Sequence, residues 1–131
     1  MDETTSESDL VDAYLKHFAT RDDALFWAVT AVNELVGKDP ERAWNLTLRL
    51  IDKAPNPESL SYVAAGPLED LLNDHGGAVI DRVELHARRD PKFRLALSDV
   101  WGTSNAPGDI FDRVLRAVGP GSNFRWGARI K

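Results

Sequence analysis

Four X-Pro pairs divide the sequence, and they constrain the fold more than any other feature. Asp39-Pro40, Asn56-Pro57, Gly66-Pro67 and Asp90-Pro91 each stand directly before a stretch of helical periodicity. Proline is favoured at the first position of a helix, where no backbone N–H is needed, and Asp or Asn before it accepts a hydrogen bond from a first-turn amide. Each pair therefore predicts the start of a new, short helix.

Apolar residues recur at helical spacing between residues 8 and 118. From Phe93 to Trp101, for example, they stand at i, i+3, i+4, i+7 and i+8. With no stretch that reads as a strand, the pattern predicts an all-α domain, a compact stack of about eight short antiparallel helices made of αα-hairpins in a short solenoid-like arrangement. The expected helices cover 8–20, 22–36, 40–54, a short helix from 57, 67 up to Gly76-Gly77, 77–89, 91–101 and 109–118.

The expected helix 40–54 has the widest apolar face. Its apolar side chains sweep an arc of roughly 200° at 100° per residue, which is typical of a helix packed on two sides. We expect Trp44 on this helix and Trp101 on the helix 91–101 to be core residues. Ser6 or Ser8 is expected to cap the first helix.

The domain boundaries follow from where the helical pattern begins and ends. We expect a disordered acidic tail at 1–8, a single helical domain at 9–118 and a C-terminal tail at 119–131. The 131 residues contain no cysteine, so the core must form without disulfides. The acidic N-terminus does not resemble a secretion signal and the longest apolar stretch, 24–36, is too short to span a bilayer, which predicts a cytoplasmic protein without a membrane segment.

The charge is divided unevenly along the chain. Residues 1–75 hold 15 acidic and 6 basic side chains, whereas residues 76–131 hold 6 acidic and 10 basic ones. The overall charge of −5 argues against a dedicated nucleic-acid-binding protein, although the basic second half keeps a regulatory nucleic-acid-binding module open as an alternative. A dipole of this kind can orient a protein partner.

The segment from Ala43 to Gly102 resembles a bacterial family of small domains of unknown function. The resemblance implies no established activity, cofactor or catalytic residue. By size and style the family is similar to immunity proteins that neutralise toxins, which is an analogy of type. The motifs are AW-x-L-x-L-x-LI, AAGPLEDLL-x-x-HG, IDRVE, ARRDPKFR-x-AL and VWG, found here at Ala43-Trp44, Ala64–Leu72, His75-Gly76, Ile80–Glu84, Ala87–Arg94 and Val100–Gly102.

The densest run of polar residues lies across the two helices expected at 67–89. It suits either acid–base chemistry by carboxylates and imidazole, as in a small hydrolase or lyase, or a structural role. The structural interpretation is favoured, because Glu69 can complete a capping box, His75 can sit at a helix C-terminus, and Glu84 and Arg88 form an i, i+4 pair. The candidate charge cluster comprises Glu69, Asp70, His75, Asp81, Arg82, Glu84 and Arg88.

The sequence contains no motif that is typical of other catalytic or ligand-binding sites. His17, His75 and His86 stand on three different expected helices, and none has a second histidine at i+3 or i+4, so no metal site is predicted. The serines lack the glycine spacing of a nucleophile elbow, and no glycine-rich phosphate loop is present. The sequence therefore predicts no catalytic residue, no metal and no cofactor.

Two groups of residues are not explained by packing. Phe26 and Trp27 lie at the rims of an already full apolar helix, and Leu85 projects on the side away from the apolar stripe of its helix. Phe124, Arg125 and Trp126 combine aromatic and guanidinium groups near the C-terminus. Residues of these types are enriched at protein interfaces. We therefore expect a non-enzymatic protein–protein interaction domain, for example an immunity protein that binds a toxin stoichiometrically.

Overall fold

The computed structural model describes residues 6–100 and 108–119, and all regular structure in these ranges is helical. A short 3₁₀ helix at Asp23–Leu25 precedes α2, and a π-helical turn at Ala64–Leu68 joins α4 to α5. The seven α-helices are α1 (Glu7–Thr20), α2 (Phe26–Lys38), α3 (Pro40–Lys53), α4 (Pro57–Val63), α5 (Glu69–Arg89), α6 (Pro91–Leu97) and α7 (Gly108–Val118).

The predicted helix starts are confirmed at four places. Ser6 caps α1 by accepting a hydrogen bond from the amide of Asp9 at 3.0 Å. Asp39, Asn56 and Asp90 each accept from a first-turn amide, and each is followed by a proline at the start of its helix. These caps use one short polar side chain for orphan amides that the helix itself cannot satisfy.

The helices are longer and fewer than the sequence suggested. Because α4, the π turn and α5 follow one another without a gap, the described residues form six continuous helical stretches rather than about eight. Gly66-Pro67 lies inside the π turn, where the backbone of Gly66 is not helical, and Gly76-Gly77 follows a kink at His75 inside α5, so both pairs mark kinks within one helical stretch and not gaps between helices. By contrast, α6 is shorter than predicted: it ends at Leu97 and not near residue 101, because a turn at Ser98 and Asp99 follows it.

Gly66 and Gly76 also have a packing role. A Cβ atom on Gly66 would lie 2.9 Å from the hydroxyl of Tyr14, and one on Gly76 would lie 2.9 Å from Cγ2 of Ile110. Both distances are shorter than van der Waals contact. Glycine therefore makes room for the Tyr14 hydroxyl at Gly66 and lets α7 approach α5 closely at Gly76, in addition to the kinks at Gly66 and His75.

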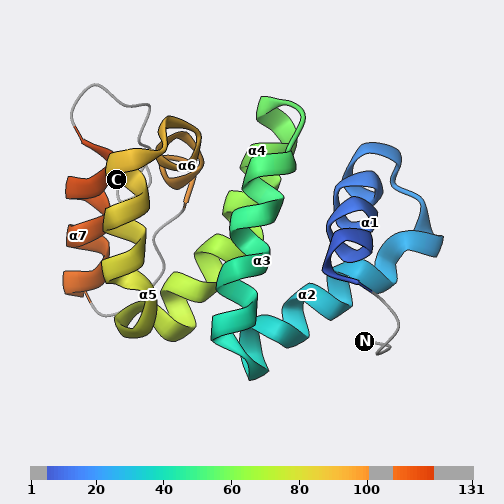
Figure 1. Cartoon of the computed structure of the whole chain (residues 1–131), viewed down its shortest axis with the longest axis horizontal. Helices are drawn as coiled ribbons and strands as arrows, with labels where there is room; N and C mark the ends of the chain where they lie inside the picture. Colours follow the sequence, from blue (N-terminus) through green and yellow to red (C-terminus); the bar gives the residue numbers. More distant parts are fainter. Residues whose placement is uncertain (1–5, 101–107, 120–131) are drawn as a thin grey trace.

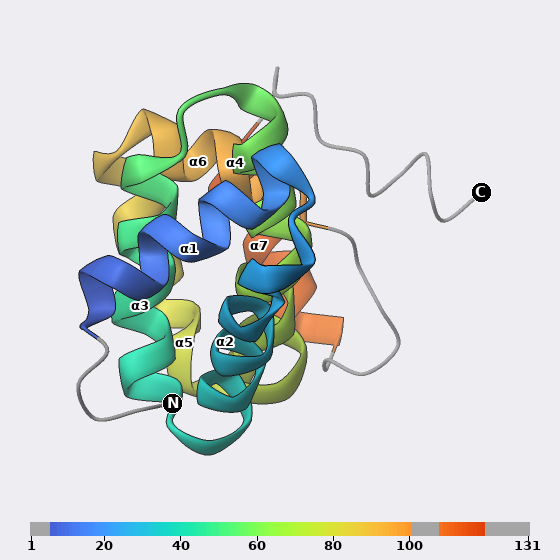
Figure 2. The same cartoon turned by 90° about the vertical axis from the view of Figure 1, so that its right-hand side faces the viewer.

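The helices pack side by side along the longest axis of the molecule. Figure 1 shows α1 and the start of α2 at one end, α3 and α4 in the middle, and α6, α7 and the second half of α5 at the other end. In the view onto the first end, α1 crosses in front of α3, and α2 lies below α1 (Figure 2); α1 contacts both. The central place predicted for α3 is confirmed, since α3 contacts α1, α2, α4, α5 and α6.

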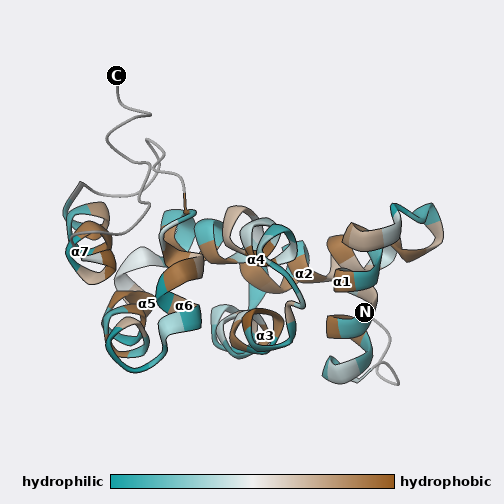
Figure 3. Cartoon of the chain, turned by 90° about the horizontal axis from the view of Figure 1, so that it is seen from above, coloured by the Kyte–Doolittle hydropathy of each residue, from teal (hydrophilic) through white to brown (hydrophobic). Residues whose placement is uncertain are grey.

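The core runs through the whole stack. Hydrophobic and hydrophilic stretches alternate along the helices, as expected for helices buried on one side (Figure 3). Trp44 of α3 is 3% exposed and packs against Phe93 of α6 and the ring of His86. Trp101 lies outside the described residues. None of the helices in the described ranges is both long and apolar enough to cross a membrane.

Candidate functional site

The members of the candidate charge cluster contact different helices and do not form one site, and His75 is the first example. Its backbone is not helical (φ −136°, ψ 29°), so it marks a kink within α5 at the position where the sequence predicted a helix C-terminus. The Nε2 atom lies 2.7 Å from the carbonyl oxygen of Val36 in the last turn of α2. Carbonyls in the last turn of a helix have no partner within the helix. His75 therefore joins α5 to the end of α2.

A second part of the cluster binds α7. Arg113 donates from Nε to Oε2 of Glu84 at 2.9 Å, and from Nη2 to Oε1 of Glu84 and Oδ1 of Asp81, both at 2.6 Å. This hydrogen bonding by Arg113 is the main cause that lowers the pKa of Glu84, and the Arg88 guanidinium lowers it further by attraction. The predicted partner of Glu84 was Arg88, whereas the bidentate partner is Arg113, 29 residues along the chain.

The Glu84–Arg113 contact predicts an acid-sensitive part of the stability. Because the pKa of Glu84 is lowered by folding, the contribution is fully present above the unfolded pKa of about 4.3 and is lost as the pH falls through the folded value. Glu84→Gln should therefore be less stable than the parent at neutral pH, and the two unfolding free energies should converge at acidic pH. Denaturation at a series of pH values measures this. Asp112→Asn on α7 is the matched control, and a gap for Glu84→Gln that stays constant with pH would contradict the assignment.

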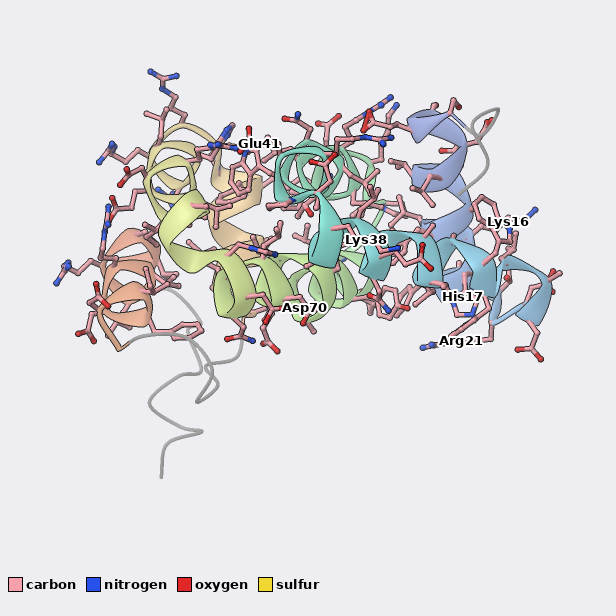
Figure 4. All side chains as sticks on the ribbon, turned by 90° about the horizontal axis from the view of Figure 1, so that it is seen from below. Lys16, His17, Arg21, Lys38, Glu41 and Asp70 are labelled. Carbon is pink, nitrogen blue, oxygen red and sulfur yellow. The ribbon has the colours of Figure 1, made fainter. Side chains whose placement is uncertain are left out.

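The remaining members of the cluster point elsewhere. Arg82 binds Glu41 of α3, whereas Glu69 and Asp70 lie in the first turn of α5. α5 continues directly from the π turn, and the residue before it, Leu68, makes no side-chain cap. Figure 4 shows Asp70 and Glu41 on opposite sides of the molecule.

Asp70 belongs to a partly buried group beside the π turn. Burial raises its pKa first, and the neighbouring Asp74 carboxylate raises it further. Tyr14 of α1 is 3% exposed and packs on the ring of Tyr62, with centroids 5.2 Å apart. Burial, together with Tyr62, raises the pKa of the Tyr14 hydroxyl, so this tyrosine stays neutral. The aromatic part of this group is a row of three packed rings, in which Tyr14 packs on Tyr62 and Phe18 stacks on the same tyrosine.

No metal centre is formed in the described ranges, where no three His, Asp or Glu side chains lie close enough together to share an ion. His17, His75 and His86 each contact other parts of the core: His17 lies edge-on to Phe26 at 5.7 Å, and His86 packs on Trp44 at 5.5 Å. The histidines are thus placed by packing and by the hydrogen bond to α2.

The exposed apolar residues divide into two separate surfaces. Phe26 is 54% exposed and Trp27 is 43% exposed, side by side at the start of α2. Leu85 is 37% exposed and belongs to the second half of α5, which lies toward the other end of the stack (Figure 1). These three residues are therefore not covered by the described part of the chain, although they do not form one patch. Phe124, Arg125 and Trp126 lie outside the described residues.

The two surfaces differ in charge. Trp27 and Glu34 share one exposed face of α2 at a spacing of seven residues, and Asp23 is exposed in the 3₁₀ helix just before α2. On α5, Leu85, Arg88 and Arg89 are exposed at i, i+3 and i+4. We call the first set, with Phe26, the aromatic surface, and the second the arginine surface. Their charged residues could be found in the sequence, but their separation by the length of the stack could not.

Comparison with known proteins identifies a family and no characterised relative. A family model described as a family of unknown function, DUF6869, matches residues 16–120. No curated protein and no solved structure matches the chain. The matched range contains all the motifs on which the resemblance rested and covers most of the chain, so the chain belongs to the DUF6869 family of unknown function.

Proposed function

We propose that this chain is a protein-binding domain that acts by stoichiometric association and not by catalysis. The observation that carries the proposal is the pair Phe26 and Trp27, two adjacent aromatic side chains that remain about half exposed on a folded helix. Aromatic residues are enriched in the buried centres of protein interfaces, and Trp is among the residues that contribute most to binding.

The charges around this pair define the kind of partner. Glu34 shares an exposed face of α2 with Trp27, and Asp23 is exposed just before the helix, so a partner should present basic side chains next to an apolar group. A short solenoid-like stack, which we also propose here, offers such surfaces at its ends. Neutralising a cationic toxin as an immunity protein is one form that this function could take, by occlusion of the toxin's own binding surface.

The enzyme alternative receives less support from the geometry. Its candidate residues make separate contacts, His75 with α2, Arg82 with α3, and Asp81 and Glu84 with α7. A general acid and base need to face one substrate position. Each of these contacts has a structural explanation, which favours the binding role.

Replacing the aromatic pair tests the proposal. Phe26→Ala with Trp27→Ala should lower the affinity for a partner captured from the native host by about tenfold or more, because the centre of the interface is removed. Titration of the purified partner with both forms measures the affinity. Leu95→Ala is the matched control, since Leu95 is 51% exposed on α6, outside the aromatic surface.

Two results would contradict the assignment of this surface. In one, the double variant binds the partner as tightly as the parent; in the other, Leu95→Ala weakens binding to the same degree. Helical circular dichroism and a cooperative melt of the double variant show that any loss does not come from unfolding. The expected change in stability is small, because both rings are half exposed already.

A further inference from the structure

The aromatic and arginine surfaces lie at opposite ends of the molecule and carry complementary chemistry. The start of α2 is at one end of the longest axis, and the second half of α5 is at the other (Figure 1). One surface offers two aromatic rings and the carboxylates of Asp23 and Glu34. The other offers Leu85 with the guanidinium groups of Arg88 and Arg89. Within one chain the two surfaces cannot meet.

The guanidinium character of the second surface is strengthened by its neighbours. Arg94 of α6 reaches back to the last turn of α5, where Nη1 lies 3.5 Å from the carbonyl oxygen of Ala87. Of the nearby acids, Asp81 and Glu84 accept hydrogen bonds from Arg113, and Asp90 accepts one from the amide of Lys92 at the start of α6. Arg88, Arg89 and Arg94 therefore gather at the corner between α5 and α6, all three exposed.

We propose that the occupant of the aromatic surface is a second copy of this chain, which docks head to tail through its arginine surface. Guanidinium groups pair with carboxylates and also stack on aromatic faces, Trp best of all. Arg88 and Arg89 of one copy can therefore meet Asp23, Glu34 and Trp27 of the next. The proposal rests on the binding role proposed above and names its partner.

The division of charge along the sequence supports this arrangement. Within the described ranges, residues 6–75 have seven more acidic than basic side chains (13 against 6), and residues 76–119 have one more basic than acidic side chain (7 against 6). Because the described chain runs from one end of the stack to the other, this division makes a dipole along the longest axis. Head-to-tail contacts align such dipoles favourably, and each added copy leaves one free surface at each end, which gives a ring or an open chain of copies.

Variants blocked at one end only provide the test. Trp27→Ala with Asp23→Lys blocks the aromatic surface, and Leu85→Ala with Arg89→Glu blocks the arginine surface. Sedimentation velocity of the parent chain should give a mass that rises with concentration beyond a dimer, while each blocked variant alone remains a monomer. An equimolar mixture of the two variants should form a dimer and nothing larger, because one intact surface of each kind remains. That dimer also proves that both variants are folded.

Salt provides an independent readout. Raising the NaCl concentration from about 0.05 M to about 0.5 M should weaken the association of the parent chain, because the exposed charges become screened.

Three results would overturn the proposal. The first is a parent chain that stays monomeric up to about 1 mM, a concentration at which an association with a Kd of about 1 mM would be half complete. The others are a mixture of the two variants that stays monomeric, and a singly blocked variant that associates as the parent does. If the parent is monomeric while the Phe26 and Trp27 double variant still loses a captured partner, the proposed function stands and only the identity of the partner is wrong. If that double variant keeps both its partner and its self-association, the aromatic surface is not a binding surface and both proposals fall.

Discussion

Trp44→Ala is expected to lower the unfolding free energy by about 3–5 kcal/mol, the range for removing a buried tryptophan. Trp44 is 3% exposed and lies on α3, the helix that contacts most of the others. Its ring packs on Phe93 at 5.9 Å and on His86 at 5.5 Å, so the substitution leaves a cavity where α3, α5 and α6 meet. Since domains of this size are stable by about 5–15 kcal/mol, the loss is a large fraction of the total.

Chemical denaturation of the variant measures this loss, and Trp27→Ala is the matched control. Trp27 is 43% exposed, so its replacement should cost far less than that of Trp44. Should Trp44→Ala fail to fold, Trp44→Phe keeps the test open, because a smaller ring leaves a smaller cavity and a proportionally smaller loss. A loss below about 1 kcal/mol at Trp44, or equal losses at both tryptophans, would contradict the assignment of Trp44 to the core.

The sequence was sufficient where the structure is decided by neighbours in the chain. A cap is one side chain that bonds an amide two or three residues away, which is why Ser6, Asp39 and Asp90 could be placed from the sequence. The same holds for α3, whose wide apolar stripe belongs to a single helix and correctly predicts burial on several sides.

Predictions from the sequence were least accurate where the role of a residue depends on a contact with a distant segment of the chain. Gly66-Pro67 has the appearance of a helix start, yet the π turn accommodates the proline, and the absent side chain of Gly66 makes room for the Tyr14 hydroxyl. π-helical turns of this kind interrupt an α-helix without ending it. Nothing within a few residues of Gly66 reveals that α1 packs there.

The candidate site shows the same limit. A structural role was predicted for His75 and Glu84, but their partners in the structure are Val36 and Arg113, which stand 39 and 29 residues away. Arg113 was absent from the predicted cluster, because the carboxylate partner of an arginine on the polar side of an amphipathic helix cannot be identified from the sequence of that helix. The exposure of Phe26 and Trp27 could be suspected from an over-full apolar helix, and became a surface only once the neighbours of α2 were placed.

Two adjacent glycines of α5 are expected to respond to alanine with opposite signs. Within a helix, alanine is favoured over glycine by about 1 kcal/mol. At Gly77 nothing lies within 4 Å of an added Cβ, so Gly77→Ala should raise the unfolding free energy by about 0.5–1 kcal/mol. At Gly76 the added Cβ would lie 2.9 Å from Cγ2 and 3.2 Å from Cγ1 of Ile110 on α7.

Ile110 cannot move these atoms aside by a rotation at the far end of its side chain, since both are attached directly to its Cβ. Gly76→Ala must therefore push α7 away from α5, and overpacking of this kind costs about 1–3 kcal/mol, which exceeds the gain in helix propensity. Denaturation of both single variants tests the difference in sign. Combining Gly76→Ala with Ile110→Ala should lose less stability than the sum of the two single losses, because the new methyl group enters the space that the isoleucine vacates. Equal stabilisation at both glycines, or strict additivity in the double variant, would show that α7 does not rest on Gly76 and that the pair serves some purpose other than close packing.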